Sequence, residues 1–181
     1  MVSFYPRRTE RLVLRRAALQ DVDELVPLMS DRTVSRGVPR IPYPYTRADA
    51  LKWVRWVRNV RHDATYGWGR DWVVRMDGQI VGSCHLSYNK EQARGFFGYW
   101  VGKPFRRQGI ATEIARAILD LCFRELKAQR VWAMAFADNE ASRGVLEKVG
   151  MKQEALLRRN AFVKGEWRDD ACYGILRREW L

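Results

Sequence analysis

The sequence predicts an α+β fold, a mixed α/β arrangement in which helices pack against a mostly antiparallel sheet. The first observation is that three strand patterns follow one another between residues 71 and 101, joined only by short polar turns. Short turns of this kind connect antiparallel strands. The second is a helical pattern from Ile110, which separates the strand at residues 96–101 from the next one at residues 130–136. Two strands joined by a helix are expected to be parallel.

The N-terminal part is expected to contain one strand and two helices. Residues 12–14 are apolar and of β-forming types, which indicates the strand. Asp21 is a suitable N-cap for the first helix, with Glu24 as its capping-box partner. A loop with three prolines at residues 36–46 follows, and Thr46 at its end can cap the second helix.

The second helix is expected to run to about residue 61. Its apolar stripe includes two bulky side chains, Trp53 and Trp56. A stripe of this kind is more typical of a core-facing surface or of a homodimer face than of a cofactor site.

Turn signals place the next strands. Asp77-Gly78 is the strongest hairpin signal in the chain, and it is expected to join strands at residues 71–76 and 79–87. A short polar turn then leads into the strand at residues 96–101.

The C-terminal part is expected to contain one helix and two strands. Asp138 or Asn139 can cap a short helix at residues 140–148, which Gly150 ends. A last antiparallel pair is expected at residues 152–162 and 168–176, with its turn near Lys164-Gly165.

The composition bounds the class of protein. The chain has 181 residues, of which 47% are hydrophobic, so residues 1–181 are expected to form a single domain with a sizeable core. No apolar run is long enough for a membrane span, and the N-terminus lacks the features of a signal peptide, so a cytoplasmic location is expected. Three widely spaced cysteines indicate buried thiols, and neither a disulfide framework nor a metal site.

The charge narrows the choice of partner. The chain has 33 basic and 21 acidic residues and a net charge of +12, which would attract RNA or a phosphorylated cofactor. It contains no aromatic RNA-binding signature and no long block of like charges. An anionic cofactor, with ribosome proximity as a further contribution, therefore explains the charge better than a dedicated nucleic-acid module.

The segment before the helix at Ile110 is predicted to bind phosphate. It contains Arg106, Arg107 and Gly109, and it follows a strand directly. A helix start has free backbone N–H groups and the positive end of the helix dipole, and a glycine lets an anion approach the backbone. The order strand, turn, helix therefore predicts the pyrophosphate site of a nucleotide-containing cofactor. The alternative is that the arginines are solvated loop charges and the glycine only a turn residue.

The chain also resembles a known family. Arg106-x-x-Gly109-x-Ala111 matches the acetyl-CoA signature Q/R-x-x-G-x-G/A of the GNAT superfamily of N-acetyltransferases. The segments TERLVLRR, GYWVGKPFRRQGIATE and Asn139-x-x-Ser142 resemble the RimJ/RimL-like branch of ribosomal-protein N-acetyltransferases. The matches occur in order over nearly the whole chain.

The resemblance implies the GNAT fold, whose central sheet splays apart and is flanked by helices on both faces, and it implies acetyl-CoA as the cofactor. Backbone groups of one strand would pair with the pantetheine arm, and the turn with the following helix start would bind the pyrophosphate. The cofactor-binding residues that it implies are Tyr99, Trp100, Val101, Arg106, Arg107, Gln108, Gly109, Ile110, Ala111, Thr112, Asn139 and Ser142.

The acid–base residues of the family are only partly matched. The tyrosine with which many members protonate the departing thiolate would fall at Leu146, so Ser142 is predicted to donate a proton or a hydrogen bond to the sulfur. The alternative is that Ser142 merely lies near a helix start. The glutamate that some members use as general base would fall at Ala161.

The general base is therefore open. His85 is the first candidate because an imidazole titrates near neutral pH, although a lone histidine is more often structural. Glu154, Asp170 or a water chain are the alternatives.

The acceptor is predicted from the loops. Arg36, Tyr43 and Tyr45 in the proline-rich loop, and Tyr173 near the C-terminus, are expected to line its site, although the tyrosines could equally be packing residues. The favoured function is direct transfer of an acetyl group, in a ternary complex, to the N-terminal α-amine of a protein or peptide. A small amine such as an aminoglycoside or polyamine, and a non-catalytic ribosome- or RNA-binding module, are the alternatives.

Overall fold

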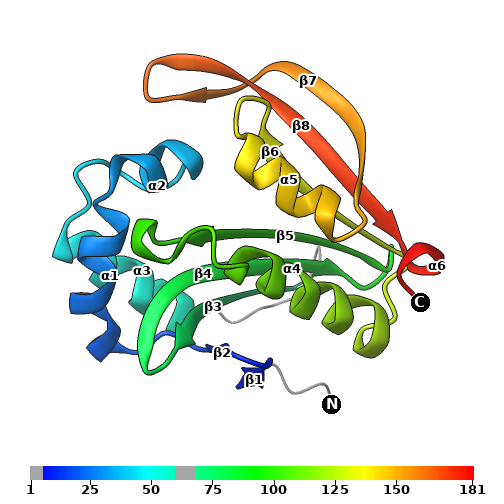
Figure 1. Ribbon diagram of the computed structural model, residues 1–181. Helices are drawn as coiled ribbons and strands as arrows, with labels where there is room; N and C mark the ends of the chain where they lie inside the picture. The colour runs from blue at the N-terminus through cyan, green and yellow to red at the C-terminus, as the bar shows by residue number, and fades with distance from the viewer. Residues whose placement is uncertain (1–5, 60–67) are drawn as a thin grey trace.

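A computed structural model describes residues 6–59 and 68–181, in which eight strands form one sheet (Figure 1). The strands are β1 (Arg7–Arg8), β2 (Val13–Arg15), β3 (Trp68–Met76), β4 (Gln79–Asn89), β5 (Arg94–Val101), β6 (Arg130–Phe136), β7 (Lys152–Val163) and β8 (Glu166–Leu176). Their order across the sheet is β1-β2-β3-β4-β5-β6-β8-β7. Only β5 and β6 pair in parallel; the other neighbours are antiparallel, which confirms the predicted fold class.

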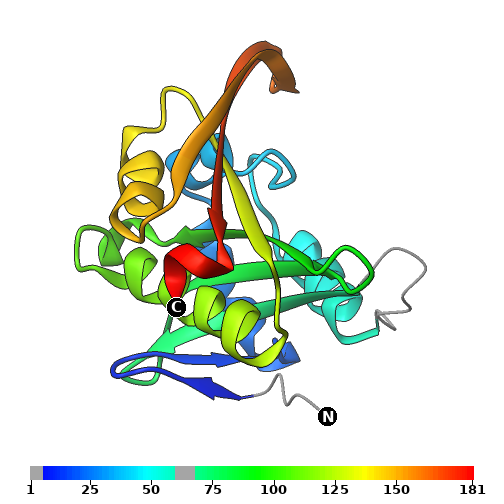
Figure 2. The same ribbon diagram turned by 90° about the vertical axis from the view of Figure 1, so that its right-hand side faces the viewer.

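Helices cover both faces of this sheet (Figure 2). The α-helices are α1 (Val22–Met29), α2 (Arg32–Gly37), α3 (Arg47–Asn59), α4 (Ile110–Asp120), α5 (Glu140–Lys148) and α6 (Arg177–Trp180). Short helical turns are η1 (Leu19–Asp21), η2 (Lys103–Phe105) and the π-helical turn η3 (Leu121–Glu125), which continues α4.

Two apolar cores lie on opposite sides of the sheet. Trp72 and Val73 are consecutive residues of β3, so their side chains point to opposite faces. Trp72 is buried with residues of α4 and α5, whereas Val73 is buried with residues of α1, α2 and α3. The molecule therefore has an α4–α5 face and an α1–α3 face, and these two names are used below.

The two parallel strands diverge. β5 pairs with β6 only where Arg94, Gly95 and Phe96 face Arg130, Val131 and Trp132. Beyond these three pairs, β5 continues to Val101 while β6 turns away with β8 and β7 (Figure 1). This splayed centre is the feature that the family resemblance implied.

The far end of the β7–β8 hairpin reaches α2 (Figure 1). Lys164 in its turn donates a hydrogen bond to the backbone carbonyl of Ser35. Arg168 in β8 donates to the carbonyl of Arg36 at 2.9 Å. The hairpin and α2 thus meet across the open end of the splayed strands.

Several local predictions are confirmed. Asp77 and Gly78 have positive φ values of 48° and 79° in the turn between β3 and β4. Thr46 caps α3 by accepting the N–H of Asp49 at 3.2 Å. Trp53 packs against the α1–α3 core, while Trp56 is exposed. The predicted continuation of α3 to residue 61 lies outside the described residues.

The predicted capping box at Asp21 and Glu24 is wrong. The Asp21 carboxylate makes no side-chain cap to α1; it accepts hydrogen bonds from Arg15 and from the Ala18 N–H. Glu24 instead accepts the backbone N–H of Ile80 at 2.9 Å. Tertiary partners have taken both carboxylates away from the helix end.

The proline-rich loop was predicted to begin at Arg36, but Arg36 belongs to the short helix α2. Asp31 caps this helix by accepting the N–H of Thr33 at 2.7 Å. In the described part of the chain no helix is long and apolar enough to cross a membrane. Cys84 and Cys122 are buried free thiols as expected, whereas the free thiol of Cys172 is half-buried.

Candidate active site

The predicted phosphate turn ends in a left-handed glycine. Gly109 has φ +79° and is the N-cap of α4, whose first internal hydrogen bond joins the Glu113 N–H to the Gly109 carbonyl. The N–H groups of residues 109–112 precede that bond and have no acceptor among the described residues. The turn therefore presents a row of free donors at the positive end of a three-turn helix.

A side chain at position 109 would narrow this turn. A Cβ built on Gly109 would lie 3.4 Å from the Nη2 atom of Arg11, and its φ is one that residues with side chains rarely adopt. The glycine thus permits the left-handed backbone conformation of the turn and leaves room beside Arg11.

The arginines of the turn differ in their positions. Arg107 is exposed, with φ +62°. Arg106 is half-buried; its Nε donates to the Val101 carbonyl at 3.1 Å and its Nη1 to Thr33 Oγ1 at 2.6 Å. Arg106 therefore connects the end of β5 to α2, whereas Arg107 has no hydrogen-bond or ion-pair partner in residues 6–59 and 68–181.

Sequence reasoning missed Arg11 as a residue of this turn. Its Nη1 donates to the Gln108 carbonyl at 3.1 Å, and it forms an ion pair with Glu113 at 2.8 Å. No local pattern could have found it, because Arg11 and the turn are nearly a hundred residues apart in the chain.

The divergence of the strands leaves one side of β5 open. Tyr99, Trp100 and Val101 pair with β4 on one side and have no strand partner on the other among the described residues. An extended ligand can pair with such an edge as an added strand. The edge ends directly at the phosphate turn, so a long ligand with a phosphate end could use both.

On the α4–α5 face, the open strand meets the start of α5. Asn139 caps α5 by accepting the Ser142 N–H at 3.1 Å, which holds its side-chain oxygen at the helix start. The Ser142 hydroxyl lies 3.2 Å from the Tyr99 hydroxyl. Burial raises the pKa of Tyr99 to about 12, and the hydrogen bond with Ser142 lowers it by less. Tyr99 therefore stays protonated near neutral pH and can donate a hydrogen bond toward Ser142.

On the α1–α3 face, a histidine lies beside the same stretch of β5. His85 in β4 is directly opposite Gly98 in β5. Its Nδ1 lies 3.2 Å from Asp71, and its Nε2 lies 2.7 Å from Ser87 Oγ. A Cβ on Gly98 would meet no atom of the described residues within 4 Å, whereas a Cβ on Gly69 in β3 would lie 3.1 Å from the imidazole Cε1. The ring therefore leans toward β3 and leaves the space over Gly98 open.

The two alternative bases have other partners. Glu154 pairs with Arg130; the hydrogen bond and charge of that guanidinium lower the pKa of the carboxyl despite some desolvation. Such a carboxylate is a weaker base, and Glu154 is poorly suited to accept a proton. Asp170 is buried and accepts a hydrogen bond from Asn160 at 2.8 Å.

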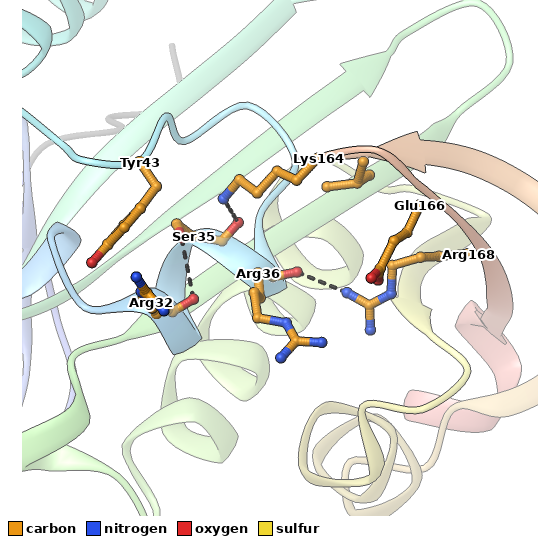
Figure 3. A pocket seen from close by; sticks show the side chains of 8 residues that line it. Arg32, Ser35, Arg36, Tyr43, Lys164, Glu166 and Arg168 are labelled. Atoms are coloured by element: carbon orange, nitrogen blue, oxygen red, sulfur yellow. Dashed lines mark hydrogen bonds between the residues drawn. The ribbon is translucent and has the colours of Figure 1, made fainter.

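The predicted acceptor residues separate into two pairs. Arg36 and Tyr43 line a cavity of about 290 Å³ between α2 and the β7–β8 hairpin (Figure 3). The prediction for Tyr45 and Tyr173 needs correction. Tyr45 is buried in the α1–α3 core. Tyr173 is fully buried on the α4–α5 face, where its hydroxyl donates to Glu147 at 2.8 Å.

The cavity has further lining residues that the sequence did not single out as a group. They are Arg32, Ser35, Val163, Lys164, Glu166 and Arg168. They come from α2 and from a hairpin more than 120 residues later in the chain, so only the folded structure brings them together.

Comparisons with known proteins place the chain in a family. Residues 11–152 match the model of the acetyltransferase (GNAT) domain. YdaF of Bacillus subtilis strain 168, provisionally named as a ribosomal N-acetyltransferase, is 36% identical over 58% of this chain and 57% of its own length. The SPbeta prophage-derived uncharacterized N-acetyltransferase YokL of the same organism is 29% identical over 94% of this chain and 93% of its own.

More distant relatives show how varied the acceptors are. The structure of Mycobacterium smegmatis RimJ in complex with CoA-disulfide superposes with a TM-score of 0.80 at 25% identity, over 93% of this chain and 83% of that one. The spermidine N(1)-acetyltransferase of Escherichia coli strain K12 is 25% identical over 62% of this chain and 61% of its own length. The chain is thus a GNAT N-acetyltransferase of the RimJ/RimL type, a family whose enzymes use acetyl-CoA.

Proposed function

We propose that the protein transfers the acetyl group of acetyl-CoA directly to the N-terminal α-amine of a protein or peptide. Bound acetyl-CoA supplies an activated acetyl thioester, and the residues of this chain hold it and move the protons. The free N–H groups of residues 109–112, with Arg107 and Arg11 beside them, fit the pyrophosphate. The open edge at Tyr99, Trp100 and Val101 fits the pantetheine amides.

The observation that carries this proposal is the pair of polar groups on the two sides of β5. Gly98 and Tyr99 are consecutive residues, so they present opposite faces of the strand. His85 lies opposite Gly98, and Ser142 lies against Tyr99. A proton acceptor and a proton donor thus stand on the two sides of the same opening, as a transfer from thiol to amine needs.

In this arrangement His85 is the general base. Asp71 holds its Nδ1 side, so the Nε2 atom is the one that accepts the proton of the amine, directly or through Ser87. Ser142 donates a proton or a hydrogen bond to the departing thiolate. The Tyr99 hydroxyl donates in turn to the Ser142 oxygen. No tyrosine is needed at Leu146, which is buried in the core.

The preference for a peptide amine over a polyamine rests on charge. A polyamine requires carboxylates around its ammonium groups, but the cavity beside the open strands has four basic residues and one acidic residue. The spermidine-type acceptor is therefore the second candidate. Membership of an enzyme family weighs against the non-catalytic ribosome- or RNA-binding alternative.

The proposal can be tested with synthetic peptides and acetyl-CoA. Thiol release and mass spectrometry would follow acetylation of a free N-terminus, with the same peptide blocked by prior N-acetylation as the control. We expect transfer only to the free α-amine. Acetylation of spermidine or lysine side chains, with no α-amine product, would refute the proposed acceptor.

A further inference from the structure

The cavity in Figure 3 holds an excess of positive charge that the described chain does not neutralise. Arg32 and Arg36 are one helical turn apart on α2, so their guanidinium groups share a face and repel each other. Among the described residues, neither has a carboxylate within ion-pair distance. Arg32 instead lies over the ring of Tyr43, 5.0 Å from its centre. Both charges remain available to a ligand.

The opposite wall adds two cations that are held in place. Lys164 donates to the Ser35 carbonyl, and desolvation lowers the pKa of its ammonium group. Arg168 donates to the Arg36 carbonyl and pairs with Asp138, and its guanidinium lies 3.9 Å above the ring of Phe136. Fixed cations facing two free ones make a preorganised site for an anion.

The cavity adjoins the proposed transfer site. A Cβ on Gly37, the last residue of α2, would lie 4.0 Å from the Asn139 side chain. Asn139 and Ser142 are three residues apart at the start of α5, which is about 5 Å along a helix. Arg168 also contacts Asp138, the residue before Asn139. A molecule with its amine at the open strands can therefore place a nearby group in the cavity.

We infer that the cavity selects peptides that have carboxylate side chains close to the acceptor amine. This inference rests on the proposed function and names its substrate class. An extended peptide advances about 3.3 Å per residue, so an acidic side chain at its second to fourth residue would reach the guanidinium groups of Arg32 and Arg36. Glu166, also in the lining, limits the negative charge that the cavity can accept, so separate carboxylates of a peptide fit it better than the closely spaced phosphates of a nucleic acid.

The experiment compares two heptapeptides that share the N-terminal residue and differ only in Glu or Gln at positions 2–4. We expect kcat/KM to be at least about tenfold higher for the acidic peptide, because charge-assisted hydrogen bonds form only with Glu. The ratio should fall as salt is raised, since the cavity is open to solvent. Equal values for the two peptides, or a preference for Gln, would overturn the inference.

Variants identify the residues responsible. In Arg32→Gln/Arg36→Gln the ratio of the two kcat/KM values should fall close to one. Neither side chain has a described hydrogen-bond acceptor, so the fold should persist, and calorimetric titration with CoA checks this. The matched control Arg55→Gln/Lys90→Gln removes two exposed charges elsewhere and should keep the ratio. An unchanged ratio in Arg32→Gln/Arg36→Gln would contradict the assignment of the acidic preference to these two residues.

A binding measurement separates this inference from the proposed function. Fluorescence anisotropy with the acidic heptapeptide already N-acetylated and labelled at its C-terminus does not depend on turnover. We expect the acidic peptide to bind more tightly than the Gln peptide, and this difference to be lost in Arg32→Gln/Arg36→Gln. That result supports the inference about the cavity even if no free peptide is acetylated. In that case only the proposed function fails. Displacement of the peptide by a single-stranded oligonucleotide at equal concentration would assign the cavity to nucleic acid and overturn the inference.

Discussion

The hydroxyl of Tyr99 lies 3.2 Å from the hydroxyl of Ser142, across the opening between β5 and α5. The two residues are 43 positions apart in the chain, and their contact joins the open stretch of β5 to the start of α5 on the α4–α5 face. Because the pKa of Tyr99 is raised to about 12, this pair carries at least one donatable proton throughout the neutral range.

This contact predicts that Ser142→Ala lowers kcat by about 10²-fold, because the thiolate loses its donor. Ser142→Thr keeps a hydroxyl and should retain most of the rate. Tyr99→Phe should reduce kcat by less than Ser142→Ala does. Because the two residues act together, the double variant should reduce kcat by less than the product of the two single reductions. Initial rates measure this, with CoA affinity as the control for folding. Full kcat in Ser142→Ala would exclude the donor role.

A second prediction concerns His85. His85→Gln should lower kcat/KM at pH 7, where an α-amine is largely protonated and must lose a proton to attack. At pH 9 the amine is mostly neutral in solution, so the deficit should shrink. Asp71→Asn should give a smaller deficit of the same pH dependence, because Asp71 acts on the reaction through the orientation of the imidazole.

The measurement is the ratio of variant to parent kcat/KM at the two pH values, with a peptide acceptor. A deficit that is equal at pH 7 and pH 9 would indicate a packing role for His85. Asp170→Asn distinguishes the remaining alternative: if that variant shows the pH-dependent deficit and His85→Gln does not, the base is Asp170.

Features that depend on neighbours in the chain could be predicted from the sequence. The Asp77-Gly78 turn and the Asn139 cap follow from partners no more than three residues away. The strand-turn-helix order around Gly109 is local in the same way. These elements also fix the position of the phosphate turn and of Ser142.

The rest depends on contacts between distant segments. Asp21 and Glu24 have the pattern of a capping box, but Arg15 and the Ile80 N–H are closer competitors in the folded chain. The cavity has walls from α2 and from the β7–β8 hairpin, and neither wall is a ligand site by itself. Arg36 could be predicted as an acceptor-site residue because it adjoins the proline-rich loop. Lys164 can be recognised as a lining residue of the cavity only from the fold.

A third prediction tests the phosphate turn with two glycines of equal φ. Gly109 and Gly78 both have φ +79°, so replacement by Ala should cost each about 1 kcal/mol of stability from backbone strain. Only Gly109→Ala should lose CoA affinity, by at least about tenfold, because its Cβ would lie 3.4 Å from Arg11 Nη2 in the turn whose free N–H groups are proposed to hold the pyrophosphate.

Calorimetric titration of each variant with CoA separates strain from binding. A Cβ on Gly78 would meet no atom of the described residues within 4 Å, so Gly78→Ala has the same backbone strain without a side-chain contact and is the matched control. Equal CoA affinity in the two variants would remove residues 109–112 as the pyrophosphate site.

The last prediction concerns the fully buried carboxylate of Asp21. It accepts hydrogen bonds from Arg15 at 2.6 Å and from Arg75 at 3.2 Å, both partly exposed. Burial raises the pKa of Asp21. The hydrogen bonds from Arg15 and Ala18 and the charges of Arg15 and Arg75 lower it by more, so the pKa in the folded protein is below its ordinary value. Asp21→Asn leaves both guanidinium groups without this partner, and it should lower the free energy of unfolding by about 2–4 kcal/mol at pH 7.

The ion pairs of Asp21 with Arg15 and Arg75 also predict how stability depends on pH. A carboxyl whose pKa is lower in the folded state stabilises the protein above its ordinary value of about 3.9, and loses that contribution as the pH falls through the lowered value. The stability difference between parent and Asp21→Asn should therefore narrow on acidification below about pH 4. Urea titrations at several pH values measure it, with Asp23→Asn, an exposed carboxylate two residues away, as the control. A difference that stays constant down to the lowest measurable pH would show that the ionised carboxylate does not stabilise this site.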